Sequence, residues 1–282
     1  MKENGLVSVI IPTYNRDLYY ISRAIESVKQ QTYRNYEIIV VDDNIHNSNY
    51  NLKILNYCKN KKIIYLSTKG KQGANVARNI GAHHAKGNYL AFLDDDDIWL
   101  KNKLEIQMAY FTPKISMVYS NGYIIKSNFK YLYTQTKNFE TKGNLYKLFL
   151  YNYIGPTVTA LIKRDCFFNV GMFDETMPSK QDYDLWIRIV EKYEVIGINK
   201  PLFIYARHNS HQMTKDYKLI IKGYSRIYEK NINYIKNDFI IRFFFYLKLA
   251  KIYKNNKRFI KYFKCLFISC SNLKYKRLKV LF

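Results

Sequence analysis

Residues 89–97 read Tyr-Leu-Ala-Phe-Leu-Asp-Asp-Asp-Asp, a short apolar run that ends in four adjacent carboxylates. An apolar run of this length, bounded by polar residues, predicts a buried strand. Similar strands are predicted at 7–12, 37–41 and 62–66, and they alternate with helices predicted at 18–32, 52–58 and 73–85. This alternation predicts an α/β fold with a mostly parallel sheet and helices on both faces.

Polar residues follow three of these strands. Thr13 to Arg16 follow the first strand, Asp42 and Asp43 follow the second, and Asp94 to Asp97 follow the fourth. In such sheets, ligands bind beyond the carboxyl ends of the strands. We therefore expect three clusters from distant parts of the chain to lie along one edge.

The acidic cluster is the strongest chemical signal. Four adjacent carboxylates repel one another unless a cation neutralises them. Their oxygens suit Mg²⁺ or Mn²⁺, which also binds substrate phosphates and stabilises a departing diphosphate. The alternative is a solvated acidic turn that caps a helix predicted near Trp99 to Phe111.

Other candidates have both a functional and a structural interpretation. Asp42 can accept hydrogen bonds from a base or ribose, or serve as a turn residue. Arg78, on a predicted helix, can hold a phosphate or an acidic loop, or remain solvated. Asp182 can cap its helix or take a proton from an acceptor hydroxyl, and Asp184 is expected to pair with Arg188.

The second half of the chain has a less regular pattern. Strands are predicted at 117–120, 123–126, 157–163 and 202–206, and a helix at 182–191. His208, just after the last strand, can reach a metal or a diphosphate, although a lone His is more often an ordinary polar residue. From about residue 215 the chain is predicted to be helical, so we expect a catalytic domain at 1–214 and a helical extension at 215–282.

Charge is concentrated in this extension. The chain has a net charge of +24, and residues 218–282 hold 17 Lys or Arg against Glu229 and Asp238. Such an excess favours an anionic partner. Aromatic and aliphatic residues at 239–245, Phe259, Phe263, Leu266 and Phe267 mix with these lysines at roughly helical spacing. They predict a basic amphipathic surface for an anionic membrane leaflet, with a packed appendage or a dimer contact as alternatives.

The remaining composition bears on location. The four cysteines have no zinc-binding spacing, which favours reduced thiols in the cytosol. The sequence shows neither a signal-peptide pattern nor an apolar run of about 18–20 residues that spans a membrane. We expect a cytoplasmic protein that is peripheral on the cytoplasmic face of the membrane.

Six segments, in this order, resemble the family 2 glycosyltransferases of the GT-A fold over about residues 5 to 210. They are Val9-Ile-Ile-Pro-Thr-Tyr-Asn-Arg16, Ile39-Val-Val-Asp-Asp43, Ala77-Arg-Asn-Ile-Gly81, Phe92-Leu-Asp-Asp-Asp-Asp-Ile-Trp99, Gly171-Met-Phe-Asp-Glu175 and Gln181-Asp-Tyr-Asp-Leu-Trp186. The resemblance implies an inverting, metal-dependent transfer of a sugar from a nucleotide donor, most commonly a UDP-sugar. The acceptor would be a glycan or lipid-linked hydroxyl in bacterial surface-polysaccharide synthesis.

The resemblance also implies roles for single residues. The base and ribose would be held by Asp42 and by Pro12, Thr13, Tyr14, Asn15 and Arg16. Arg78 would assist at the diphosphate, Asp96 would bind the metal, and Asp94 or Asp95 would meet the ribose. Asp182 would be the catalytic base, although many relatives have Glu where this chain has Gln181.

Two other classes of protein compete with this interpretation. A nucleotidyltransferase would carry a glycine-rich, arginine-containing loop after the first strand, where this chain has Pro-Thr-Tyr-Asn-Arg. A nucleic-acid-binding protein would explain the net charge, but it would line its groove with cations and aromatic residues. The acidic cluster argues against such a groove at this edge, so we expect no nucleic-acid partner.

Overall fold

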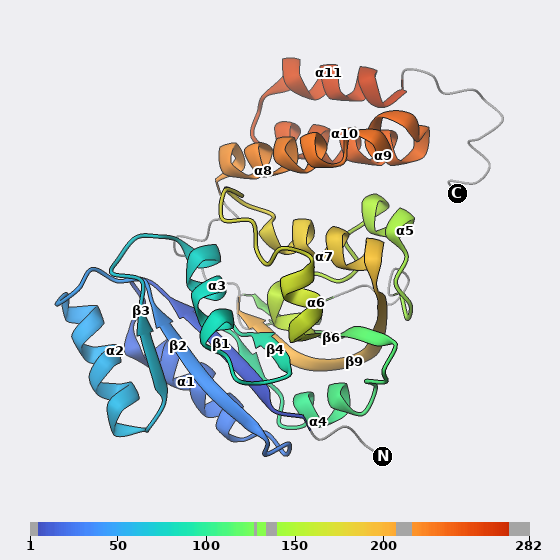
Figure 1. Ribbon diagram of the computed structural model, residues 1–282. Coiled ribbons are helices and arrows are strands. Elements are labelled where there is room, and N and C mark those ends of the chain that lie inside the picture. Colours follow the sequence, from blue (N-terminus) through green and yellow to red (C-terminus); the bar gives the residue numbers. More distant parts are fainter. Residues whose placement is uncertain (1–4, 127–128, 134–139, 207–215, 271–282) are drawn as a thin grey trace. The chain divides into compact units, whose positions relative to one another are not determined.

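The structure, a computed structural model, describes residues 5–126, 129–133, 140–206 and 216–270 (Figure 1). The chain divides into two compact units. The first holds 1–144, 153–175 and 182–208, and the second holds 145–152, 176–181 and 209–282. The domain boundary predicted at residue 214 and the candidate ligand His208 lie outside the described residues, so both stay predictions.

The first unit is built on one mixed sheet with strand order β3-β2-β1-β4-β8-β6-β9-β5, and β7 pairs with β6. The strands are β1 Val7–Thr13, β2 Tyr36–Asp42, β3 Ile64–Ser67, β4 Tyr89–Phe92, β5 Ile98–Trp99, β6 Ile115–Lys126, β7 Phe129–Leu132, β8 Ala160–Lys163 and β9 Glu194–Ala206. The helices are α1 Leu18–Lys29, α2 Asn49–Asn60, α3 Ala74–His84, α4 Lys103–Met108, α6 Arg164–Asn169 and α7 Gln181–Lys192. The predicted α/β class is confirmed.

The four strands β3, β2, β1 and β4 run parallel, and helices cover both of their faces (Figure 1). Every residue of β1 is buried. Val9 shares one core cluster with Ile25 of α1 and Ile54 of α2, whereas Ile10 points to the other face, toward Gly81 of α3. Strands buried on both sides read as continuous apolar runs, which is why the sequence predicted this half of the sheet.

Helix α3 lies unusually close to the sheet at Gly81. A methyl group on Gly81 would lie 2.5 Å from Cγ2 of Ile10 and 3.1 Å from Cγ2 of Val41. Because real Cβ contacts are longer, only a residue without a side chain fits this helix-to-strand distance.

The strand ends meet at one edge of the sheet. Thr13 is in register with Asp42, and the Asp43 amide donates to the Thr13 carbonyl oxygen (2.8 Å). The Leu93 amide donates to the Ile10 carbonyl oxygen (3.0 Å), so the acids that follow Leu93 come out beside the end of β1. The expectation that the three polar clusters share an edge is confirmed.

The sheet beyond β4 differs from the predicted strands. Predicted strands 117–120 and 123–126 form one continuous strand, β6. Asn121 does not interrupt it, because its Nδ2 donates to Asn199 Oδ1 (3.0 Å) near β-bulges in the β6–β9 pairing. Gly122 lies against the Phe203 ring, where any side chain would clash. The strand can pass this point because glycine has no side chain.

The helix predicted near Trp99 to Phe111 is also shorter than expected. Trp99 belongs to β5 and pairs with Phe203 of β9, and α4 begins only at Lys103 with Asn102 as its N-cap. The acids at 94–97 therefore do not cap a helix, and that alternative is wrong. Likewise, residues 157–163 begin with a 3₁₀ turn over Thr157–Thr159, and only Ala160–Lys163 form β8.

The second unit is helical in its described residues. Its helices are α5 Leu145–Leu150, α8 Tyr217–Lys230, α9 Ile232–Asn237, α10 Phe239–Asn255 and α11 Phe259–Cys270. Asp216 and Asp238 cap α8 and α10, because their carboxylates accept hydrogen bonds from first-turn amides. Among the described helices, none combines the length and apolar character needed to cross a bilayer.

Candidate active site at the carboxyl edge of the sheet

The turn after β1 binds the acidic cluster directly. Thr13 Oγ1 donates to Asp95 Oδ2 (2.7 Å), and Arg16 Nε donates to Asp95 Oδ1 (3.1 Å). The Arg16 Nη2 atom donates to Asp96 Oδ2 (3.1 Å). One arginine therefore holds two successive carboxylates in fixed positions, with charge-assisted hydrogen bonds.

The rest of this turn places two side chains at the protein surface. Pro12 is buried, whereas Tyr14 and Asn15 are exposed. Asn15 has a positive φ of 49°, and its amide donates to Asn44 Oδ1 (2.8 Å). The turn thus presents Tyr14 at the surface next to the carboxylates, but its contact with a nucleotide stays a prediction.

Arg78 of α3 reaches the first acid of the cluster. Its Nη2 donates to Asp94 Oδ1 (2.6 Å), and its guanidinium lies 5.5 Å from the centre of the Phe173 ring. The residue is only 4% exposed, so it is not a solvated helix arginine. Its Nε and Nη1 atoms are buried and have no hydrogen-bond partner in the described part of the chain. Such donors are costly unless a ligand oxygen accepts from them.

The acids are neutralised in part by these arginines. Asp94, Asp95 and Asp96 each pair with Arg16 or Arg78. Burial raises the pKa of Asp95 to about 7, even though Arg16 and the Thr13 hydroxyl favour the ionised carboxylate. Cationic arginine side chains therefore relieve much of the repulsion, and a divalent ion at the cluster stays a prediction.

The acidic cluster can still take part in holding a divalent ion. In the described residues, no group of three His, Cys, Asp or Glu side chains forms a site complete in itself. Asp96 is half-buried rather than fully enclosed. Because Mg²⁺ commonly uses one or two carboxylates and completes its shell with substrate phosphates and water, Asp96 fits such a role.

Asp42 lies at the end of β2 and is fully buried. Its Oδ1 accepts from the amide and the side chain of Asn44 (2.9 and 2.7 Å). Its Oδ2 accepts from Asn51 Nδ2 (3.0 Å) and from the Tyr65 hydroxyl (2.9 Å). The carboxylate thus organises the turn after β2, and its predicted contact with base or ribose stays a prediction.

Asp43, for which the sequence suggested no role of its own, organises the neighbouring loop. Its Oδ2 accepts from the Gly73 amide (2.9 Å) and its Oδ1 from the Gln72 amide (2.8 Å). Three successive residues of this loop have positive φ values of 69°, 109° and 56°: Lys69, Gly70 and Lys71. Such strained backbone is usually held by surrounding structure near functional sites.

The loop at 170–175 is hydrogen-bonded both to α3, the helix that carries Arg78, and to α7. Asn79 Nδ2 donates to the Phe173 carbonyl oxygen and to Glu175 Oε1 (both 2.9 Å), and Asn79 Oδ1 accepts from the Phe173 amide (3.1 Å). On the other side, Arg188 Nη2 donates to the Met172 carbonyl oxygen (2.8 Å). These contacts, which were not predicted from the sequence, join three of the motif segments and so give those segments a structural role.

Asp182 lies inside the first turn of α7, which begins at Gln181, so it is not the N-cap. It is half-buried, and its Oδ1 accepts from the Tyr183 amide (2.7 Å). Only Tyr193 separates α7 from β9, so the helix runs back along the sheet and its first turn lies toward the carboxyl edge. Convergence of Asp182 and the acidic cluster on one cleft stays a prediction.

The predicted pair of Asp184 and Arg188 is confirmed. Arg188 Nη2 and Nε donate to Asp184 Oδ2 at 2.7 and 3.0 Å, and Asp184 is buried. This pair is structural, because it fixes the arginine that grips the 170–175 loop.

Comparison with known proteins gives consistent results. The model of the family described as Glycosyl transferase family 2 matches residues 8–176. The Escherichia coli UDP-Glc:alpha-D-GlcNAc-diphosphoundecaprenol beta-1,3-glucosyltransferase WfgD is 35% identical over 199 residues, which cover 70% of this chain and 74% of that protein. An uncharacterized glycosyltransferase of Rickettsia felis is also 35% identical over 199 residues, but this chain spans only 32% of its length.

Two solved structures resemble the chain. S. aureus TarS 1–349 in complex with UDP-GlcNAc has a TM-score of 0.64 at 16% identity, covering 92% of this chain and 90% of that 1–349 chain. The mannosyltransferase PcManGT from Pyrobaculum calidifontis, in complex with GDP-Man and Mn²⁺, has a TM-score of 0.63 at 15% identity, covering 98% and 78%. At these identities the likeness shows the fold alone, and it confirms the expected GT-A architecture.

Proposed function

The chain belongs to glycosyl transferase family 2, and from this premise we propose that it moves a sugar from a nucleotide donor to a hydroxyl group in surface-polysaccharide synthesis. The observation that carries the proposal is the buried Arg78, which holds Asp94 and keeps two further N–H groups for an anionic ligand. The proposed donor is a UDP-sugar and the proposed acceptor a glycan or lipid-linked oligosaccharide. Both are supported by the activity for which WfgD is named.

The donor diphosphate would bind at the end of β4. Arg78 would donate to it from Nε and Nη1, and the exposed turn of Tyr14 to Arg16 would border the base and ribose. Asp42 would act here by fixing the shape of the neighbouring turn, since its own oxygens already accept four hydrogen bonds. Mn²⁺ or Mg²⁺, held by Asp96, would neutralise charge that develops on the leaving diphosphate.

Asp182 would accept the proton of the acceptor hydroxyl. Its carboxylate is half-buried in the first turn of α7. The 170–175 loop joins α7 to α3, because Arg188 of α7 and Asn79 of α3 both donate hydrogen bonds to it. With the base and the leaving group on opposite sides of the sugar, the hydroxyl oxygen would attack C1 in line and invert its configuration. An α-linked donor would then give a β-linked product.

A donor screen tests the proposed function. The full chain would be incubated with Mn²⁺ and a panel of nucleotide sugars, and released nucleotide would be measured. We expect release from one donor class, loss of release in EDTA, and recovery on adding Mn²⁺. We also expect Asp96→Asn to require about tenfold more Mn²⁺, because it removes a charged ligand.

The matched control for this screen is Asp165→Asn, which removes an exposed acid from α6. It should leave the Mn²⁺ requirement unchanged. Absence of nucleotide release with every donor would reject the proposed activity, and undiminished release in EDTA would reject its metal dependence.

Helix α11 supplies a face for the proposed peripheral attachment to an anionic inner leaflet. Ile260, Phe263 and Phe267 recur at helical spacing and are 88%, 63% and 77% exposed, and Lys261 and Lys264 lie on the same helix. A basic helix with such an apolar face binds membrane surfaces by inserting that face among the headgroups. The partner proposed for it is the cytoplasmic face of the cell membrane.

The structure corrects which aromatic residues can contribute to this face. Ile241 and Phe245, within the predicted run at 239–245, are buried in the interior of the second unit. Helix α10 buries only Ile241, Phe245 and Ala250 among its described residues. Ile260, which the sequence analysis did not name, is the most exposed of the large apolar side chains on α11.

Vesicle binding tests this attachment. Changing Phe263 and Phe267 together to Asp should lower binding of the full chain to vesicles with anionic lipid by more than tenfold, because burial of each ring contributes about 1.5–3 kcal/mol. Tyr131→Asp, which changes an exposed aromatic residue of β7, is the control. Equal binding by the double variant and the control would reject α11 as the attachment site.

A further inference from the structure

Arg16 bridges two neighbouring acids with different atoms of its guanidinium. Its Nε donates to Asp95 Oδ1 and its Nη2 donates to Asp96 Oδ2, both at 3.1 Å. The next residue, Asp17, caps α1, and the guanidinium lies 5.6 Å from the centre of the Tyr20 ring on that helix. The bridge is therefore held in place by the start of α1 as well as by the two acids.

The two bonds of this bridge differ in their surroundings. Asp95 is only 6% exposed, and its second oxygen accepts from the Thr13 hydroxyl (2.7 Å), so both of its oxygens are engaged inside the protein. Asp96 is half-buried, and the Arg16 side chain is 28% exposed. Water can therefore solvate Nη2 when it leaves Asp96, and no charge is stranded in the interior. The bond to Asp95 is the anchor, and the bond to Asp96 is the exchangeable one.

Arg78, the other arginine on the acidic cluster, differs from Arg16 in this respect. Its Nη2 donates to Asp94 Oδ1 (2.6 Å), but its side chain is only 5% exposed. Release of Asp94 would leave a guanidinium in the interior without a carboxylate, which is costly. Of these two arginines, Arg16 is therefore the one suited to release an acid.

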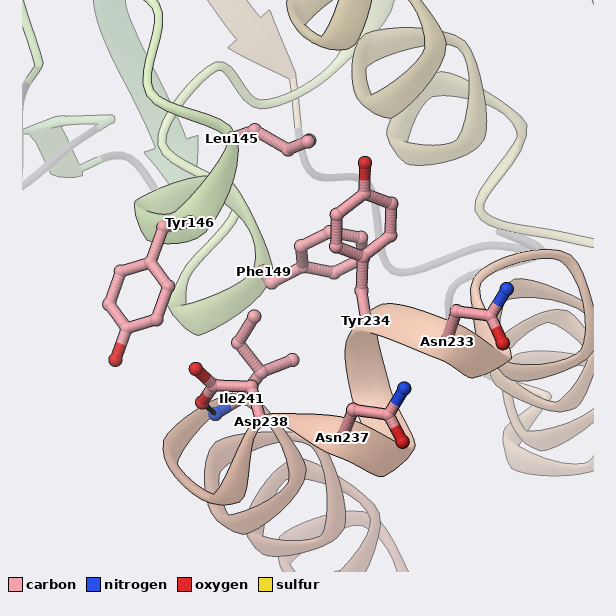
Figure 2. A pocket seen from close by; sticks show the side chains of 8 residues that line it. All are labelled: Leu145, Tyr146, Phe149, Asn233, Tyr234, Asn237, Asp238 and Ile241. Carbon is pink, nitrogen blue, oxygen red and sulfur yellow. Dashed lines mark hydrogen bonds between the residues drawn. The ribbon is translucent and has the colours of Figure 1, made fainter.

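Asp238 in the second unit shows a different use of a carboxylate. It lines an apolar pocket of about 460 Å³ between α5, α9 and α10 (Figure 2). Its Oδ1 accepts from the Ile241 amide (2.9 Å) at the start of α10, and none of the described residues that line the pocket is Lys or Arg. Asp238 therefore caps a helix and has no counter-ion in its pocket that a second cation could replace.

A divalent ion on Asp96 would compete directly with Arg16. The Nη2 atom already donates to Asp96 Oδ2, and an ion on the same carboxylate would bring two positive charges close together, where they repel. The acids at 94–97 face two guanidinium groups, so the cluster alone attracts a further cation weakly. A nucleoside diphosphate adds negative charge and the oxygen ligands with which Mg²⁺ and Mn²⁺ complete their shell. The ion is therefore favoured together with the nucleotide.

We propose that Arg16 is an exchangeable counter-ion for Asp96. Its Nη2 atom releases Asp96 to the divalent ion that arrives with the nucleotide, whereas its Nε atom keeps its bond to Asp95. Arg16 thereby makes metal binding depend on the nucleotide and keeps a lone metal ion out of the site. This role rests on the proposed function for the metal at Asp96, and it adds the residue that couples the two ligands.

Mn²⁺ binding to the full chain tests the coupling. The free ion is measured by its electron paramagnetic resonance signal, without nucleotide and with UDP, after correction for the Mn²⁺–UDP complex in solution. In the unmodified protein UDP should raise the affinity for Mn²⁺ about fiftyfold, within the range of typical coupling between two ligands. Arg16→Gln, which keeps an N–H donor but no charge, should bind Mn²⁺ about tenfold more tightly without nucleotide and change less than threefold with UDP.

The matched control is Arg23→Gln, which removes the same charge from α1, where Arg23 lies against the Tyr19 ring. It should leave the affinity for Mn²⁺ within about twofold of the unmodified protein, because exposed charges farther from the site are screened. Arg16→Met is a second variant that removes the donor to Asp95 as well, and it should show the same tighter binding. Thermal unfolding of each variant shows that it is folded.

The possible outcomes separate this coupling from the proposed metal dependence. If neither Arg16 variant binds Mn²⁺ more tightly than Arg23→Gln without nucleotide, Arg16 is not a competing counter-ion and the proposal is overturned. Weaker binding in both variants also overturns it, since Arg16 would then support the metal site. If the unmodified chain binds no Mn²⁺ with or without UDP, the metal dependence itself fails and the coupling fails with it.

Discussion

Replacing Asp182 with Asn is expected to lower sugar transfer about a thousandfold while donor affinity changes less than twofold. Asparagine has the same shape and can still accept the hydrogen bond from the Tyr183 amide, so the first turn of α7 should stay intact. It cannot take a proton from the acceptor, and a general base contributes about 10²–10⁴-fold to such a step. The effect should therefore fall on kcat and not on donor KM.

The measurement is steady-state transfer together with donor binding by calorimetry. Glu191→Gln, which neutralises an exposed acid two turns further along α7, is the matched control and should retain activity. A thousandfold loss accompanied by weak donor binding would point to a role at the nucleotide instead. Full activity of Asp182→Asn would reject the base assignment.

Replacing Arg78 with Met is expected to raise donor KM and lower kcat, with a combined loss of more than about 10²-fold, while stability changes little. The guanidinium is buried with two unsatisfied donors, so its removal also removes a cost of desolvation. Loss of the guanidinium would remove the cation proposed to face the diphosphate. Charges positioned in advance in this way stabilise a transition state by several kcal/mol.

Two further variants separate this functional role from a structural one. Arg78→Lys keeps a charge but loses the planar fork, so it should recover only part of the activity. Arg188→Met removes the cation that pairs with the buried Asp184 and should cost about 3–5 kcal/mol of unfolding free energy. If Arg78→Met were destabilised as strongly as Arg188→Met, Arg78 would be a structural residue.

The parallel half of the sheet could be predicted because each of its strands contains a short apolar run. Every strand and helix predicted before residue 93 is present, with ends shifted by a few residues. Strand β6 could not be predicted as one element. Its continuity through Asn121 and Gly122 depends on Asn199 and Phe203, which are distant in sequence.

The site was predicted less completely than the fold. Adjacent acids such as Asp42 and Asp43 look equivalent in sequence, but Asp42 accepts from Asn51 whereas Asp43 accepts from the Gly73 amide, so they organise different turns. The role of Asn79 was hidden because its partners lie almost a hundred residues away. Residue type suggested the carboxylates and arginines, whereas their pairing required the tertiary structure.

The tight contact between Gly81 and Ile10 links two positions that would have to vary together. A larger residue at position 81 would push α3 outward and carry Arg78, one turn earlier, away from the end of β4. Shortening the residue at position 10 would restore the spacing. In a library that randomises both positions, active clones with a larger residue at position 81 should therefore have a smaller residue at position 10. The close contact between α3 and β1 would then appear as covariation between these two positions.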